Sequence, residues 1–165
     1  MMLLVKAGII LITMAIELLF ASIVEIDVIK PDFILIVVIC ISFISGAEEG
    51  TIFGFAGGLL KDIFSVHLLG INALTKTLIG YVAGTIREKI FSHHIIWIAA
   101  ISAFVFTVIN NVMTYFLLKS LYSNYNFDAN LKNITITQAL INAIVLPLFF
   151  IGINKIFYYF RRKNK

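Results

Sequence analysis

The chain has 165 residues, of which 61% are hydrophobic and 13% are charged, and its mean hydropathy is +1.02. Soluble domains carry roughly 25% charged residues, and a soluble domain of this length could not hide about 100 apolar side chains from water. Few prolines and no polar repeat exclude a disordered chain, and the single cysteine, Cys40, excludes a disulfide framework. The composition predicts an all-α, polytopic membrane protein forming one integral-membrane domain over residues 1–165.

Apolar segments follow one another along the whole chain. The segment 7–24 has no small-residue cleavage site, so it is predicted to be a retained helix and not a signal peptide. With 63–86, 90–118 and 133–154, it is long enough for the roughly 20 residues that a membrane-crossing helix needs. Two shorter segments, 33–47 and 49–64, bring the prediction to about six transmembrane helices.

The positions of the basic residues predict the orientation. Six passes place both termini on one side of the membrane. One side receives Lys6, Arg87, Lys89, Lys155, Arg161, Arg162, Lys163 and Lys165, and the other receives Lys30, Lys61, Lys119 and Lys132. The positive-inside rule therefore predicts cytoplasmic termini. Because these charges are explained as topology signals, the net charge of +4 does not indicate a nucleic-acid partner.

Glycines are concentrated in the middle of the chain. Gly50, Gly54 and Gly58 are four residues apart, and Gly80 and Gly84 repeat this spacing, so each set forms a smooth stripe on a helix. Such stripes allow close helix packing, either within the chain or against a partner's transmembrane helix. We expect the first stripe to face a partner, so that Gly54→Leu would abolish partner binding and leave the protein folded.

Several polar residues lie in or beside these segments. Asp62 is either an ordinary loop acid or the cap of the next helix, and Asn72 could hydrogen-bond to another span. Glu17 and Lys76 are charges inside predicted spans, where burial is costly. Their similar depths allow an ion pair if the two helices touch; otherwise each side chain reaches water or a polar pocket separately. Three further residues lie within spans, where interhelical hydrogen bonds are favoured over contacts with a ligand: Asn110, Asn111 and Asn142.

No catalytic motif accompanies these residues. The sequence has no phosphate-binding loop, no H-E-x-x-H motif and no Ser/His/Asp grouping. Cys40 lies within an apolar segment, where a thiol is ordinarily inert. His93 and His94 have no cysteine or carboxylate cluster beside them, which argues against a metal site. We therefore predict neither an enzyme nor a cofactor.

The order of motifs in the middle of the chain is more specific than any one of them. The succession is Pro31-Asp32, Glu49-Gly50, Gly54-Phe55-Ala56-Gly57-Gly58-Leu59-Leu60-Lys61-Asp62, Leu69-Gly70-Ile71-Asn72-Ala73-Leu74 and Gly80-Tyr81. Over about residues 31–89 it resembles the MreD family, the integral-membrane rod-shape-determining proteins of bacteria. The family's motif positions correspond to Pro31, Asp32, Gly54, Gly58, Asp62, Gly70, Asn72 and Gly80, and the resemblance implies no catalytic role for them.

The resemblance implies a function and a set of partners. It implies a non-enzymatic scaffold of the cell-wall elongation machinery in the bacterial cytoplasmic membrane, in contact with an MreC-like protein. An MreB-like filament and peptidoglycan synthases are implied in the same assembly. The implied fold is that of the substrate-binding subunits of energy-coupling-factor transporters.

Two alternatives come from other functional classes. One is a vitamin-binding subunit of an energy-coupled importer, but the A-x-x-x-A stripe typical of such subunits is missing, since Ala7, Ala15 and Ala21 are not four residues apart. The other is an oligomeric channel, which would need a polar stripe along a pore-facing helix. The spans contain isolated polar residues instead.

Overall fold

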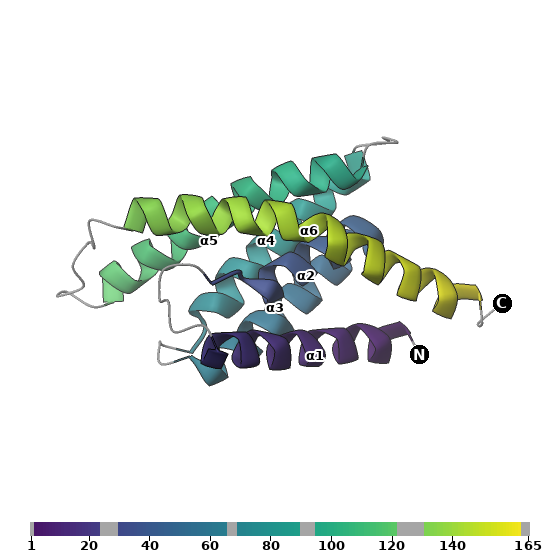
Figure 1. Cartoon of the computed structure of the whole chain (residues 1–165), viewed down its shortest axis with the longest axis horizontal. Coiled ribbons are helices and arrows are strands. Elements are labelled where there is room, and N and C mark those ends of the chain that lie inside the picture. The colour runs from purple at the N-terminus through teal and green to yellow at the C-terminus, as the bar shows by residue number, and fades with distance from the viewer. Residues whose placement is uncertain (1, 24–29, 66–68, 90–94, 122–130, 163–165) are drawn as a thin grey trace.

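A computed structural model describes residues 2–23, 30–65, 69–89, 95–121 and 131–162. These residues form six helices: α1 (Met2–Ile23), α2 (Phe33–Ser45), α3 (Ala47–Phe64), α4 (Ile71–Lys89), α5 (Ile95–Leu121) and α6 (Leu131–Arg162). The start of α1 and the end of α6 lie at the same end of the bundle (Figure 1). The predicted all-α fold of a polytopic membrane protein is confirmed.

Three of the described helices are long and apolar enough to cross a membrane by themselves: α1, α5 and α6. The predicted span 63–86 is wrong as a unit, because α3 continues to Phe64 and α4 begins only at Ile71. Gly70, just before α4, has a φ of 108°, a backbone conformation that glycine adopts without the steric cost of a side chain. The chain therefore turns inside the segment that its hydropathy predicted to be one continuous span.

Helix α2 forms the centre of the bundle. Every residue of α2 from Phe33 to Phe43 is buried, and α2 contacts all five other helices. A helix that is apolar on all sides is expected inside a large protein or in lipid. At 1.5 Å per residue its 13 residues reach roughly 20 Å, less than the roughly 30 Å thickness of the hydrocarbon core. Its polar ends must therefore be satisfied by other helices.

The C-terminal end of α2 meets its neighbours in a tight turn. Gly46 has a φ of 97° there, and its N–H donates to Ser42 O at 2.9 Å. Arg87 Nε donates to Phe43 O at 3.1 Å, so a cation stabilises the free carbonyl groups of α2. Glu88 Oε1 accepts from the first N–H of α3, that of Ala47, at 2.9 Å. Residues from α4 thus satisfy both helix ends at this turn.

The α3–α4 pair is the most closely packed pair in the bundle. A Cβ atom placed on Gly50, Gly54 or Gly58 would overlap backbone atoms of α4, namely those of Gly80, Lys76 and Asn72. The register is antiparallel, so the contact points move one turn along each helix in opposite directions. The stripe therefore faces α4 of the same chain, and the expectation that it faces a partner is wrong.

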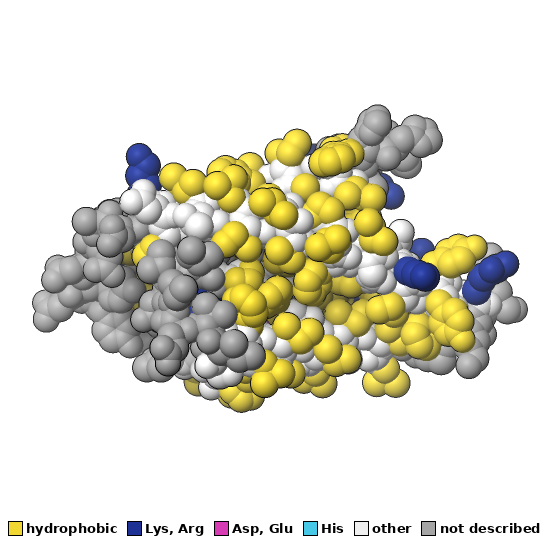
Figure 2. Space-filling model, in the orientation of Figure 1, with side chains coloured by type: hydrophobic (Ala, Val, Ile, Leu, Met, Phe, Trp, Pro, Cys, Tyr) yellow, Lys and Arg dark blue, Asp and Glu magenta, His cyan; other side chains and the backbone are white. Residues whose placement is uncertain are grey.

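The exterior of the bundle is apolar. Figure 2 shows hydrophobic side chains over most of the visible face and lysine or arginine side chains at its two ends. Large residues are strongly exposed on three outer helices, among them Leu4, Trp97, Ile144 and Leu148. Helix α6 bends along its length (Figure 1) and holds Pro147 in its interior, where proline removes a backbone hydrogen bond and kinks a helix. This surface suits lipid, as a polytopic membrane protein requires.

Candidate functional site

Asp32 lies at the start of the central helix and is 4% exposed. Its Oδ1 accepts from the N–H of Leu35 at 2.9 Å, the bond expected of an N-cap aspartate. Helix α2 therefore begins directly after Asp32. Because the first turn of α2 is enclosed by protein, its free N–H groups require partners from within the bundle. Asp32 supplies one of them.

Two lysines neutralise the Asp32 carboxylate. Lys61 Nζ on α3 and Lys76 Nζ on α4 each lie 2.9 Å from Asp32 Oδ2. The side chain of Lys76 is completely buried, and that of Lys61 is 22% exposed. A buried charge is strongly destabilising when unpaired, so the two ammonium groups and the carboxylate depend on one another.

Glu17 on α1 balances the second lysine. Its Oε1 lies 2.7 Å from Lys61 Nζ, and its Oε2 accepts from the N–H of Ile34 at 3.1 Å. Glu17 therefore binds a cation and also satisfies a second free N–H of α2. With two carboxylates and two ammonium groups, this set of four side chains has no net formal charge.

The remaining two helices, α5 and α6, contribute neutral polar groups, and α4 contributes one more. Asn142 on α6 accepts from the N–H of Asp32 at 3.1 Å through Oδ1. Its Nδ2 donates to Thr107 Oγ1 on α5 at 3.0 Å. Asn72 Oδ1 on α4 accepts from Lys76 at 3.1 Å. We call these seven residues the Asp32 cluster: Glu17, Asp32, Lys61, Asn72, Lys76, Thr107 and Asn142. All six helices contribute to it.

A direct pair between Glu17 and Lys76, one of the two arrangements considered for these charges, is not formed. Helices α1 and α4 do not contact one another, and the two charges are joined only through Lys61 and Asp32. Matched depth along the membrane normal does not specify which helices are neighbours. Lys61 was expected among the basic residues on the side of the membrane opposite the termini, whereas its ammonium group lies in the Asp32 cluster. In the sequence, only its place next to Asp62 distinguished Lys61 from the other basic residues.

Asp62 caps α4, which is one of the two roles considered for it. The carboxylate is 1% exposed. It accepts from the N–H groups of Gly70, Asn72 and Ala73 at 2.9–3.0 Å, and from Asn72 Nδ2 at 2.9 Å. Asn72 therefore connects the Asp62 cap to the Asp32 cluster, and its predicted bond to another helix is present.

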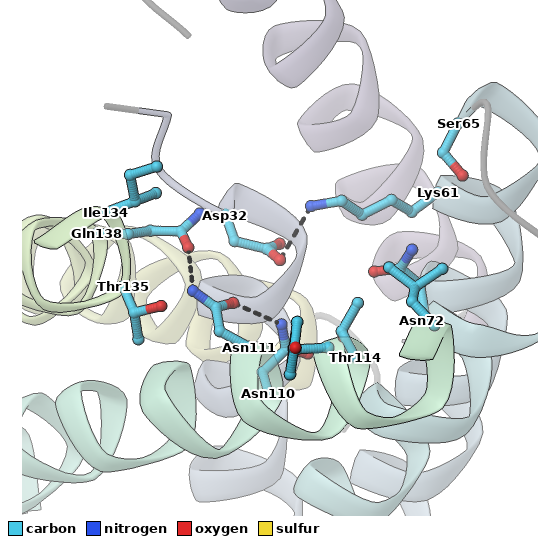
Figure 3. Close-up of a pocket in the computed structure, with 12 residues that line it drawn as sticks. Asp32, Lys61, Ser65, Asn72, Asn110, Asn111, Thr114, Ile134, Thr135 and Gln138 are labelled. Atoms are coloured by element: carbon cyan, nitrogen blue, oxygen red, sulfur yellow. Dashed lines mark hydrogen bonds and ion pairs between the residues drawn. The ribbon is translucent and has the colours of Figure 1, made fainter. Parts of the chain in front are cut away.

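A cavity of about 290 Å³ opens beside the Asp32 cluster (Figure 3). Polar side chains from α2 to α6 predominate in its lining, which consists of Asp32, Lys61, Ser65, Asn72, Asn110, Asn111, Thr114, Tyr115, Leu118, Ile134, Thr135 and Gln138. Asn111 Nδ2 donates to Gln138 Oε1 at 2.7 Å and Asn110 Nδ2 to Asn111 Oδ1 at 3.2 Å. Asn111 therefore bonds to another helix, as predicted, whereas Asn110 bonds within α5. Gln138, which follows Thr135 and Thr137 in the sequence, was not among the predicted residues.

Gly80, Gly84 and Cys40 do not line this cavity. Gly80 and Gly84 pack against the start of α3. Cys40 is fully buried in α2, whereas His93 and His94 lie outside the described residues. Within the described ranges, no three His, Cys, Asp or Glu side chains are placed to hold a metal ion. The chemistry available at the cluster is ion pairing and hydrogen bonding at the start of α2.

Comparison with known proteins gives one match. The family model described as rod shape-determining protein MreD matches residues 1–160, a range wider than the 31–89 segment that carried the resemblance. No curated protein and no solved structure matches the chain. The implied likeness to energy-coupling-factor subunits therefore stays a prediction.

Proposed function

Since the chain belongs to the MreD family of rod shape-determining membrane proteins, we propose that it is a non-enzymatic scaffold of the bacterial cell-wall elongation machinery. The match over residues 1–160 is the observation that carries this proposal. An MreC-like protein is its direct partner, and an MreB-like filament and peptidoglycan synthases belong to the same assembly. The scaffold role fits a chain whose buried charges are used in holding six helices together.

The proposed orientation puts both termini in the cytoplasm, in the cytoplasmic membrane. The start of α1 and the end of α6 lie at one end of the bundle (Figure 1). Arg161 and Arg162 lie at that end of α6. Arg87 contacts the α2–α3 turn, and Lys6 pairs with Glu49, which follows this turn. These basic residues support the orientation by the positive-inside rule.

We assign the partner's transmembrane helix to a groove between α1 and α6. The groove has a volume of about 380 Å³ and is lined by Ile9, Ile12, Leu148, Phe149, Gly152, Ile153 and Ile156. A Cβ atom on Gly152 would meet nothing within 4 Å, so this glycine serves no packing contact among the described residues. Small residues in membrane helices allow a second helix to approach closely, and a single helix of a partner would fill such a groove.

Deletion of the gene in its rod-shaped host tests the function itself. We expect the cells to round up, and expression of the full chain to restore both rod shape and co-purification of the MreC-like protein. Cells that stay rod-shaped after complete depletion would contradict the proposal.

A matched pair of substitutions tests the groove. Gly152→Leu adds a side chain inside the groove, whereas Gly8→Leu adds the same side chain on α1 where a Cβ atom also has no neighbour within 4 Å. Gly8 does not line the groove. We expect both variants to accumulate and only Gly152→Leu to lose the MreC-like protein. Equal partner binding by both variants would remove the groove from the interface.

A further inference from the structure

The cavity beside the Asp32 cluster contains hydrogen-bonding groups that the described part of the fold does not use. Asn110 lines the cavity, is 4% exposed, and its Oδ1 has no hydrogen-bond partner among the described residues. Thr114 Oγ1, one turn further along α5, is also buried and has no hydrogen-bond partner among the described residues. Buried polar groups are ordinarily paired, and an unpaired one requires an explanation. A bound molecule in the cavity would supply the missing partners.

The charges around the cavity exclude strongly charged ligands. Lys61 would attract an anion, but the Asp32 carboxylate lies 2.9 Å from its Nζ and would repel that anion. Asp32 would attract a cation, but Lys61 and Lys76, which both lie 2.9 Å from Asp32 Oδ2, would repel it. Lys61 has three N–H groups and two partners in the described part of the chain, so one donor is left. The combination of a free donor and free acceptors suits a neutral ligand.

The size and lining of the cavity further restrict the class of ligand that it can bind. A volume of about 290 Å³ equals roughly ten water molecules and lies at the lower end of small-molecule pockets. Amide and hydroxyl groups come from Asn110, Thr114 and Gln138, and the ring of Tyr115 and the side chain of Leu118 give an apolar wall. A sugar ring presents hydroxyl groups that both donate and accept, together with apolar C–H faces.

We propose that this cavity binds one neutral, polyhydroxylated ring, supplied either by a free monosaccharide or by the sugar headgroup of a glycolipid. One hydroxyl donates to Asn110 Oδ1, a second exchanges a hydrogen bond with Thr114 Oγ1, and a third accepts from Lys61 Nζ. The ring lies against Tyr115. This site is independent of the proposed scaffold role, because it uses none of the residues of the α1–α6 groove.

The test measures the melting temperature of the full chain, purified in a detergent without a sugar headgroup so that the detergent cannot occupy the cavity. Glucose, glucosamine and glucuronate are compared, because they share one ring and differ in charge. A second arm uses phosphatidylglycerol nanodiscs with and without monoglucosyl diacylglycerol. A ligand that binds only the folded state raises the melting temperature, and we expect this from a neutral sugar in at least one arm.

Two variants link any such shift to the cavity. Thr114→Val keeps the side-chain shape and removes the unpaired hydroxyl, and Asn110→Leu removes the unpaired Oδ1. We expect the sugar to bind Thr114→Val about threefold to tenfold more weakly, the effect of one hydrogen bond, and Asn110→Leu to lose the shift. Thr137→Val is the control, because Thr137 donates to Asn133 O on its own helix and does not line the cavity.

The outcomes separate the sources of the ligand and can overturn the proposal. A shift with free glucose identifies a soluble sugar, whereas a shift only in glycolipid nanodiscs identifies a lipid headgroup. Equal shifts with glucosamine or glucuronate would contradict a neutral site. No shift in either arm would mean that the cavity holds water only. A shift that persists unchanged in Thr114→Val and Asn110→Leu would place sugar binding elsewhere.

Discussion

Lys76 Nζ and Asp32 Oδ2 lie 2.9 Å apart, and both side chains are buried although the residues stand 44 positions apart in the chain. The backbone of Lys76 also packs against Gly54 at the centre of the α3–α4 interface. One residue therefore joins the glycine stripe to the Asp32 cluster. A change in either feature is expected to disturb the other.

Removing the Lys76 charge should destabilise the protein. In Lys76→Met a carboxylate at the start of α2 keeps only Lys61 as its cation, and breaking a buried pair typically costs about 3–5 kcal/mol. We expect a lower melting temperature in detergent and reduced accumulation in the membrane. Lys155→Met is the control, because Lys155 is exposed on α6. A Lys76→Met protein as stable as the wild type would show that the pair is energetically neutral.

Exchanging charges should distinguish the pairs that exist from the pair expected from depth. Glu17→Lys combined with Lys76→Glu should be no more stable than the worse single variant, since those side chains do not touch. Glu17→Lys combined with Lys61→Glu should recover part of the lost stability. Recovery should be incomplete, because Lys61→Glu also replaces the cation that lies 2.9 Å from Asp32 Oδ2 with a carboxylate. Glu17 also accepts from the N–H of Ile34. Thermal unfolding of the single and double variants measures this coupling, and full rescue of the Glu17–Lys76 exchange would refute the network described here.

Enlarging Gly54 should cause misfolding and not a selective loss of partner. A Cβ atom at Gly54 would overlap the backbone of Lys76, so even Gly54→Ala must separate α3 from α4. We expect Gly54→Ala to lower the melting temperature and Gly54→Leu to disappear from the membrane. Gly8→Leu provides the control, because a Cβ atom there has open space. An abundant, folded Gly54→Leu protein would contradict the packing of this helix pair.

Cysteine labelling should reveal the orientation. Glu48 at the α2–α3 turn and Lys132 near the start of α6 are both exposed, and the native Cys40 is fully buried, so it should not react. A membrane-impermeant maleimide should label Lys132→Cys in intact cells and Glu48→Cys only after permeabilisation. The reverse pattern would place the termini outside.

Local features of the fold were determined by the sequence alone. The apolar composition required a membrane protein. Asp62 could be recognised as one candidate cap of the next helix, because a carboxylate satisfies nearby N–H groups wherever the helix lies. The glycine spacing also identified a surface for close packing. Composition, glycine spacing and a nearby cap are all read from residues close in the chain, so the residue types were sufficient to indicate these features, although not what the glycine surface would contact.

Only the tertiary structure decided which elements became neighbours. The all-apolar sequence of α2 suited a lipid-facing helix equally well, because lipid and a protein core both favour apolar side chains. The structure encloses α2 and exposes α1, α5 and α6. The partner of Lys76 could not be deduced from the sequence either. A charge inside a span indicates only that a counter-charge is needed, and the packing of the helices determines that Asp32 provides it.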